Sequence, residues 1–441
     1  MSEESSTIVF FPEGAFGPTN NCVGIGDVLR RRGHRVVFIV EESFAGTLAA
    51  QGFEERLMRL TPPPETEEAP GQFWKDFIRD TAPVFRTSTR EQLADFIAPT
   101  FQALIDGARY VDERLREIID ELQPDLIVED NVVAFPALPA CGRPWARIMS
   151  CNPTEMKDPQ VPPPFSGLPS NDTSGWDEYW HAYRDAHREM HAAFSEFCQE
   201  RGAPPLPADD FIHESPWLNM YLYPDEVDYR REQPLGPTWH NLQASVRATD
   251  PAWELPDGLR GEEPLVYLSL GSLGSADVPL MEKLVAELAE APYRVIVSKG
   301  PQHTEFELAA NMAGEEFLPQ TEILPKVDLV ITHGGHGTVT RSLAAGVPVM
   351  VVPISRDQPD NAARVVHHGV GINVSKRSSP EKFATAVRRV LADDAIRAKA
   401  HAMADRLAPD VGAPKAIAAL EELASADGGR RPRRVGELDR P

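Results

Sequence analysis

The sequence predicts an α/β protein of two domains, each built on a sheet of parallel strands. With 441 residues, the chain is long enough for two sizeable hydrophobic cores. Apolar runs rich in β-branched residues, at 7–11 and 327–331, each lead through a turn into a helix, as is typical of parallel α/β sheets. Residues 124–131 form another such run in the first half. The two halves therefore look alike, although no literal repeat is visible.

The first half opens with a strand, a loop, a helix and a second strand. Residues 7–11 and 35–40 are the expected strands, and 22–32 is the helix between them. A right-handed crossover places the loop after residue 11 at the ligand-binding edge of the sheet. We expect a Rossmann-like domain over residues 1–233.

The second half has the same character and is followed by a helix and a tail. Residues 234–259 show no strong period and are the expected linker, and a second Rossmann-like domain is expected over 260–408. A C-terminal helix is predicted over 409–427. The Arg-rich residues 428–441 are expected to be disordered.

Composition narrows the possible partners and the compartment. Lys+Arg 44 against Asp+Glu 67 gives a net charge of −23, which disfavours nucleic acid and anionic membranes as partners. The start lacks a signal-peptide pattern, and no apolar run approaches the ~20 residues of a membrane helix. We expect a cytoplasmic protein, monomeric or homodimeric. Four widely spaced cysteines are expected as reduced thiols, neither disulfides nor a zinc site: Cys22, Cys141, Cys151 and Cys198.

A glycine-rich turn after residues 327–331 is the strongest candidate site. His333, three glycines and Thr338 lead from the strand into a helix. Glycines let the backbone approach a ligand closely, and the free N–H groups of a helix N-terminus favour an anion. The sequence therefore predicts a phosphate-binding turn. The alternative is that His333 only caps the helix.

Three motifs in order resemble the donor-binding signature of the UDP-glycosyltransferase superfamily. They are Phe-x-Pro-Gln at 317–320, His-Gly-Gly-x-Gly-Thr at 333–338 and Asp-Gln at 357–358. The resemblance is close over residues 264–424, and its nearest branch is bacterial enzymes that glycosylate macrolides and other natural products. It implies the GT-B fold, in which two Rossmann-like domains face each other across a cleft. The N-terminal domain would hold the acceptor, and the C-terminal domain the nucleotide sugar.

The resemblance also assigns roles in donor binding. The His-Gly-Gly-x-Gly-Thr turn and a serine in the turn after residues 265–270 would hold the diphosphate. An aromatic ring would stack on the base, a glutamine would read it, and an Asp-Gln pair would bind the sugar hydroxyls. A buried core role is the alternative for the aromatic residue, Phe317. The expected donor-binding residues are Ser272, Phe317, Gln320, His333, Gly335, Gly337, Thr338, Asp357 and Gln358.

Two positions depart from the family pattern. Many relatives have a glutamate that grips the ribose where this chain has Arg341, which cannot accept a hydrogen bond. Relatives also usually have a catalytic histidine after the first strand, but no histidine lies between residues 1 and 33. General-base help is typically worth 10²–10⁴-fold, so another group is expected in that role.

Asp130 is the favoured general base, because it aligns with the carboxylate that orients this histidine in relatives. Glu13 is the second candidate for the general base. The lack of a histidine also fits a phenolic acceptor, which loses its proton easily, or a non-catalytic protein. The structural alternative for Asp130 is a capping or turn residue. Four further residues are expected to contact the acceptor: Phe16, Asn20, Asn21 and Trp180.

The sequence thus predicts an inverting glycosyltransferase. It would move a hexose from a UDP- or dTDP-sugar to a hydroxyl of a hydrophobic small molecule such as a macrolide, polyketide or phenol. Neither a cofactor nor a metal is implied, because the chain has no Asp-x-Asp motif. A sugar-nucleotide epimerase or hydrolase of the same fold, and a nucleotide-sugar-binding helper that has lost its base, are the alternatives.

Overall fold

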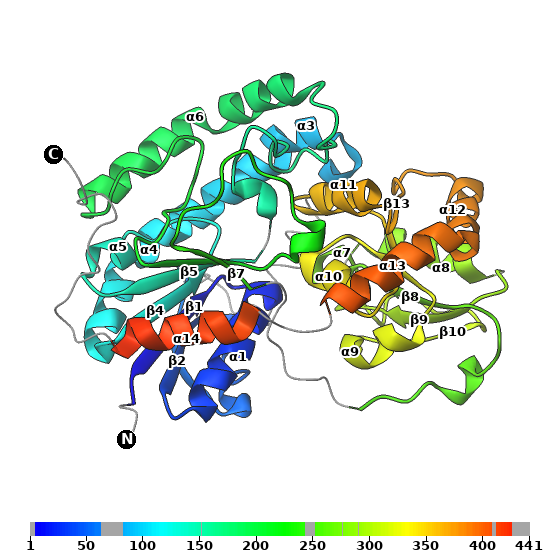
Figure 1. Cartoon of the computed structure of the whole chain (residues 1–441), viewed down its shortest axis with the longest axis horizontal. Coiled ribbons are helices and arrows are strands. Elements are labelled where there is room, and N and C mark those ends of the chain that lie inside the picture. Colours follow the sequence, from blue (N-terminus) through cyan, green and yellow to red (C-terminus); the bar gives the residue numbers. More distant parts are fainter. Residues whose placement is uncertain are drawn as a thin grey trace.

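The computed structural model describes residues 5–62, 83–150, 152–242, 252–275, 277–289, 291–407 and 412–425. These residues form two domains that lie side by side, each with a parallel β-sheet between layers of helices (Figure 1). Among these residues, no helix combines the length and apolar character needed to cross a bilayer.

The N-terminal sheet has seven parallel strands in the order β3-β2-β1-β4-β5-β6-β7. The winding direction changes between β1 and β4. Ligands of open α/β sheets bind at such switch points, beyond the carboxyl ends of the strands. The strands are β1 (Thr7–Pro12), β2 (Arg35–Glu41), β3 (Glu54–Met58), β4 (Leu126–Asp130), β5 (Trp145–Met149), β6 (Leu218–Tyr221) and β7 (Trp239–Asn241).

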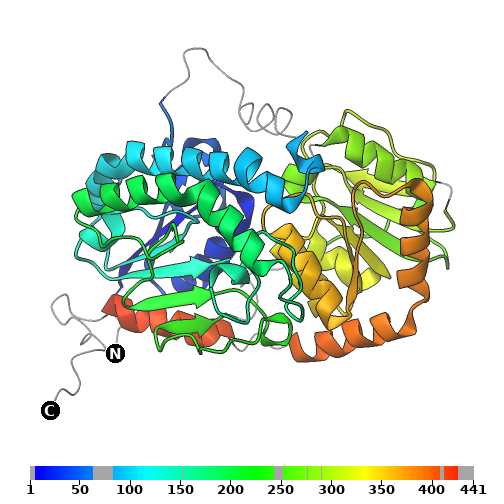
Figure 2. The same ribbon diagram turned by 90° about the horizontal axis from the view of Figure 1, so that it is seen from above.

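Helices cover both faces of this sheet. Alternate residues of β1 face opposite ways, so that Val9 packs in the core beneath α4 and α6, whereas Ile8 and Phe10 pack in the core beneath α1 and α14. Figure 2 shows α4 and α6 side by side on one face and α14 on the other. The helices are α1 (Phe16–Arg31), α3 (Thr89–Gln92), α4 (Ala98–Leu122), α5 (Ala137–Ala140), α6 (Trp176–Glu200) and α14 (Gly412–Ser425).

The C-terminal sheet repeats the same winding with six parallel strands in the order β10-β9-β8-β11-β12-β13. Its switch point lies between β8 and β11. The strands are β8 (Leu265–Ser269), β9 (Arg294–Ser298), β10 (Met312–Glu315), β11 (Leu329–Thr332), β12 (Val349–Val351) and β13 (Gly371–Asn373), and the helices are α7 (Gly271–Gly274), α8 (Val278–Ala289), α9 (Gln320–Ile323), α10 (His336–Ala344), α11 (Gln358–His368), α12 (Pro380–Ala392) and α13 (Asp394–Leu407).

The last helix returns to the first domain. The side chains of Ile417 and Leu420 on α14 are buried against the N-terminal sheet. Arg32 at the end of α1 forms an ion pair with Glu421 at 2.7 Å. The N-terminal core is therefore completed by residues from the end of the described chain.

The domain boundary differs from the expected one in one respect. Residues 239–241 lie within the stretch expected to be the linker, 234–259, but they form β7 and extend the N-terminal sheet. A strand of three partly buried residues is too short to produce a visible hydrophobic period. The expected disordered tail, 428–441, lies outside the described residues.

Candidate active site

The glycine turn that follows β11 holds the imidazole of His333 between two chain segments. A Cβ atom on Gly271, at the end of β8, would lie 2.7 Å from Cε1 of this ring, and a Cβ on Gly335 would lie 2.6 Å from Nε2. Only glycine fits at either place without displacing the ring. Gly271 and Gly334 also have φ values of +67° and +95°, which favour glycine. The C-terminal switch point is thus built around one histidine.

Burial makes His333 a neutral hydrogen-bond donor. Burial lowers the pKa of its imidazole to about 4, and a hydrogen bond with the backbone of Ser269 opposes that shift. At pH 7 the ring is uncharged. Nδ1 lies 3.3 Å from Oγ1 of Thr332. A neutral imidazole carries a single N–H, so the ring donates to an anion bound at the helix N-terminus only in the tautomer that gives up the bond to Ser269.

The N-terminus of α10 supplies the other donors of the anion site. Gly335 is the N-cap residue and has no side-chain cap. The N–H of Thr338 was expected to donate to the phosphate, but here it donates to the carbonyl of Gly335 at 3.1 Å. The first-turn N–H groups of His336 and Gly337 remain the outward-directed donors of the helix. Thr338 offers its hydroxyl instead, 3.4 Å from Nε2 of Gln320.

Arg341, which replaces the ribose-binding glutamate of many relatives, contacts the residue expected to read the base. Its Nη1 donates to Oε1 of Gln320 at 2.9 Å. Its Nη2 also lies near Gly337, since a Cβ there would be 3.2 Å away. The guanidinium is therefore held over the first turn of α10 and adds positive charge beside the anion site. Both ends of the Gln320 amide are therefore engaged, the carbonyl by Arg341 and the nitrogen by Thr338.

Phe317 lies after β10, and its ring is 55% exposed. This exposure rules out the buried core role that was the alternative for this residue. An exposed ring at the carboxyl edge of the sheet suits stacking on a base. The side chain of Ser272 lies outside the described residues, although its backbone belongs to α7.

Asp357 and Gln358 begin α11 at the end of β12. Oε1 of Gln358 accepts hydrogen bonds from the N–H groups of Ile354 and Ser355, at 2.9 and 3.2 Å. Burial raises the pKa of Asp357 to about 7, and the charge of Arg356 opposes this rise. Oδ2 of Asp357 accepts a hydrogen bond from Nδ2 of Asn361 at 2.8 Å. A carboxyl group in this state can both accept from and donate to a sugar hydroxyl.

Across the cleft, the two candidate bases lie together at the switch point of the N-terminal sheet. The N–H of Glu13 donates to the carbonyl of Asp130 at 2.9 Å, where β1 and β4 end. Oδ1 of Asp130 accepts from the hydroxyl of Ser150 at 2.9 Å. Its Oδ2 is buried and has no hydrogen-bond partner among the described residues. A buried carboxylate oxygen without a partner is costly and marks a place for a ligand donor.

Burial holds both acids above their usual pKa. Burial is the main cause for Asp130, whose pKa is raised well above its ordinary value, and the charges of Glu13 and Glu129 raise it further. Burial also raises the pKa of Glu13, and the guanidinium of Arg356 opposes this.

The expected acceptor residues are distributed around this point. Asn20 and Asn21 lie on α1, directly after the loop that carries Glu13, and Asn21 is buried. The side chain of Phe16 lies outside the described residues. Trp180 on α6 packs edge-on against Tyr183 at 5.5 Å and faces the guanidinium of Arg184. The acceptor-binding roles of Phe16, Asn20, Asn21 and Trp180 stay predictions.

Asp360 joins the two domains, although no motif in the sequence singles it out. Its Oδ2 accepts from Nδ2 of Asn152, the hydroxyl of Thr154 and the N–H of Phe165, at 2.8, 3.1 and 2.7 Å. Its Oδ1 accepts from the N–H of Gly167 at 2.7 Å. A carboxylate on the C-terminal domain thereby fixes a loop of the N-terminal domain. The only signal was a second acid three residues after Asp357.

A second interdomain contact involves His336, to which sequence reasoning gave no role. Its ring centre lies 4.2 Å from that of Tyr223, which follows β6. The guanidinium of Arg364 covers the same tyrosine at 4.0 Å and donates to the carbonyl of Val227 at 3.2 Å. Burial and two nearby arginines hold the pKa of His336 well below its ordinary value. The variable position of the glycine turn therefore packs on the other domain.

Comparisons with known proteins agree with this geometry. Residues 282–423 match the family model of the erythromycin biosynthesis protein CIII-like C-terminal domain. Over 440 residues, covering 95% of this chain and 97% of the relative, the sequence is 26% identical to O-mycaminosyltylonolide 6-deoxyallosyltransferase of Streptomyces fradiae.

Solved structures show the same architecture. The glycosyltransferase of kitacinnamycin superposes with a TM-score of 0.69 at 20% identity, covering 96% of this chain and 99% of that one. The glycosyltransferase VinC, solved in complex with dTDP, superposes with a TM-score of 0.62 at 17% identity, covering 95% and 99%. The fold is GT-B, as predicted.

Over nearly its whole length, the chain therefore resembles members of the UDP-glycosyltransferase superfamily, as the three motifs suggested. The relatives are named as glycosyltransferases, among them a 6-deoxyallosyltransferase and a mycarosyltransferase, which agrees with the enzyme class expected from the three motifs.

Proposed function

We propose that the protein transfers a hexose from a UDP- or dTDP-sugar to a hydroxyl group of a hydrophobic natural product, with inversion at the anomeric carbon. One observation carries this proposal. The guanidinium of Arg356 lies close enough to both Glu13 and Asp357 to lower the pKa of each carboxyl group. The sugar end of the donor site would therefore lie near Glu13, whose backbone bonds to that of the proposed base, Asp130.

The donor half of the reaction rests on His333 and the N-terminus of α10. As the bond between sugar C1 and the diphosphate oxygen breaks, negative charge grows on the leaving group. The ring N–H of His333 and the first-turn N–H groups would stabilise that charge more in the transition state than in the ground state. Arg341 adds positive charge beside the same turn.

The acceptor half rests on Asp130. Its Oδ2, which has no partner among the described residues, would take the proton of the acceptor hydroxyl while the oxygen attacks C1 from the opposite side. Ser150 holds the other oxygen and fixes the direction of the carboxylate. One direct displacement of this kind inverts C1.

The acceptor class is supported by the names of the relatives. The Streptomyces fradiae relative is named for a tylonolide acceptor, and the structural neighbours include enzymes of calicheamicin and spinosyn assembly. The nucleotide is supported by VinC, which was solved with dTDP. We propose that no metal takes part, so that transfer is expected to persist in excess EDTA.

The test is transfer from UDP- and dTDP-hexoses to a panel of macrolides, polyketides and phenols, followed by mass spectrometry for an added hexose. His333→Ala is expected to lower turnover by about 10²–10³-fold, the loss typical of one oxyanion-type donor, with little change in acceptor binding. The exposed His181 on α6 provides the control as His181→Ala. Unaltered turnover of the His333 variant would contradict the proposed diphosphate role. Donor consumption without a glycosylated product would identify a hydrolase or epimerase instead.

A further inference from the structure

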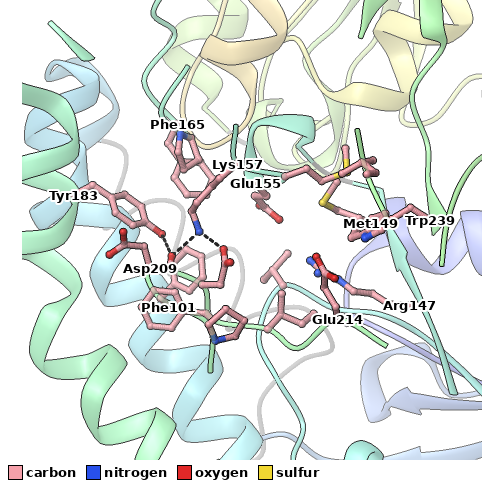
Figure 3. A pocket seen from close by; sticks show the side chains of 18 residues that line it. Phe101, Arg147, Met149, Glu155, Lys157, Phe165, Tyr183, Asp209, Glu214 and Trp239 are labelled. Carbon is pink, nitrogen blue, oxygen red and sulfur yellow. Dashed lines mark hydrogen bonds and ion pairs between the residues drawn. The ribbon is translucent and has the colours of Figure 1, made fainter. Parts of the chain in front are cut away.

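A cavity of about 180 Å³ opens in the N-terminal domain, near the carboxyl end of β5 (Figure 3). It lies among α4, α6, the end of β5 and the loop that Asp360 fixes. Val132 and Met149, which line it, are neighbours in sequence of Asp130 and Ser150. At the ~30 Å³ that a water molecule occupies, the space equals roughly six waters, enough for one substituted ring. A ligand group held here would lie near the carboxyl ends of β4 and β5.

The walls of the cavity are mainly aromatic. The rings of Phe101 and Phe211 lie 4.8 Å apart, and Phe165 meets Phe101 edge-on at 6.2 Å. Tyr183 and Trp239 add two electron-rich rings. Faces of such rings attract organic cations. The described residues contain no group of three or more acidic, cysteine or histidine side chains that could hold a metal ion, so a metal is a poor fit.

The charges around the cavity leave negative charge uncompensated. Lys157 is held by Asp210, with which it forms an ion pair, and by the carbonyl of Asp209. Arg147 is the other cation of the lining, whereas two lining acids, Glu155 and Glu214, have no ion pair among the described residues. One guanidinium cannot neutralise two carboxylates. A cationic ligand would supply the missing charge.

Glu155 is the carboxyl group best placed to meet that ligand. Figure 3 shows its side chain pointing into the cavity, between Lys157 and Arg147. Within the described chain, its carboxylate makes no hydrogen bond or ion pair, whereas Asp209 and Asp210 are both paired. Burial raises its pKa to about 7, and the charges of Arg147 and Lys157 oppose that rise. An ammonium group would restore its charged form and satisfy its oxygens.

We infer that the acceptor carries a basic amino group, and that Glu155 selects it by binding the ammonium inside this aromatic cavity. The inference rests on the proposed transfer function, because it names the class of acceptor. The cavity holds one ring or amine-bearing arm, and the rest of the acceptor lies in the cleft with its hydroxyl at Asp130. Glu155 is thus a specificity residue and takes no part in the proton transfer.

The test compares two probes that differ only in the amine, tyramine and 4-ethylphenol, by calorimetry at pH 8 with the full-length protein. A charge-assisted hydrogen bond of the usual strength predicts that tyramine binds about tenfold more tightly or better. Glu155→Gln, which keeps the shape and removes the charge, is expected to abolish that preference. Glu196→Gln, on the exposed face of α6, makes the same change in net charge and is expected to keep it.

Three results would overturn the inference: equal binding of the two probes to the unaltered protein, an unchanged preference in Glu155→Gln, or no binding of either probe. The first comparison needs no variant, so it does not depend on how the variant folds. If the protein transfers a hexose to neutral acceptors alone, the proposed function stands, but the inference that the acceptor carries an amino group is wrong. Tyramine binding at Glu155 without turnover of any nucleotide sugar would instead remove the transfer function and leave the site.

Discussion

Replacing Asp360 with alanine should loosen the contact between the two domains. The change removes the acceptor of the backbone N–H groups of Phe165 and Gly167, each at 2.7 Å. A buried donor left without a partner costs about 1–3 kcal/mol, so the two together cost roughly 2–6 kcal/mol if water does not replace the carboxylate. The amide of Asn152 and the hydroxyl of Thr154 lose the same partner. The predicted loss of stability is concentrated in the loop of residues 152–167, which donates all of these hydrogen bonds.

Hydrogen exchange of these two amides measures the effect directly. A loss of about 2 kcal/mol speeds exchange roughly 30-fold, and the loop should open without unfolding of either sheet. Asp185→Ala is the control, since Asp185 forms an ion pair with Arg188 on the exposed face of α6, where such a pair contributes little. Unchanged exchange at Phe165 and Gly167 in Asp360→Ala would refute the assignment of this carboxylate as the interdomain acceptor.

Three more predictions concern the chemistry. Asp130→Asn should lower turnover by about 10²–10⁴-fold. The activity of the unaltered enzyme should rise with pH, because a base whose pKa is raised must first lose its proton. Glu13→Gln removes a charge that raises the pKa of Asp130, so the rising limb of the pH profile of kcat/KM should move to lower pH. Gly335→Ala should displace the imidazole of His333 and weaken binding of dTDP in calorimetry, whereas a change at a glycine with open space should not. Phe317→Ala should weaken nucleotide binding by about 1–3 kcal/mol, with little change in the unfolding midpoint, because the ring is exposed. Turnover of Asp130→Asn at the original level, or nucleotide affinity unaffected in the other two variants, would contradict these assignments.

The architecture and the donor turn were predictable because local signals carry them. Buried parallel strands leave continuous apolar runs, and the turn at residues 333–338 needs glycine at positions set by backbone geometry and by the packing of one imidazole. The matching winding of the two sheets follows from the repeated order of strand, loop and helix. Such signals lie within a few residues of each other, so one sequence is enough to see them.

Contacts between distant segments were not predictable. Asp360 is one acid in a polar loop, and nothing near it in sequence reveals four donors that lie some two hundred residues away in the chain. His336 occupies a variable position of its motif, yet packs on Tyr223 of the other domain. The carbonyl of Gly335 engages the N–H of Thr338, which was expected to face the ligand. In each case the partner is chosen by tertiary packing.

The position of α14 has a consequence for how the protein is made. A ribosome releases the first domain's strands early, but Ala416, Ile417 and Leu420, which pack in the same core as β1 and β4, are synthesised after the whole C-terminal sheet. Domains usually fold in order of their appearance. Here the earlier domain must wait with an apolar face uncovered until the later one has emerged. A nascent chain arrested before residue 412 should therefore expose that face to chaperones, even when its C-terminal sheet is already complete.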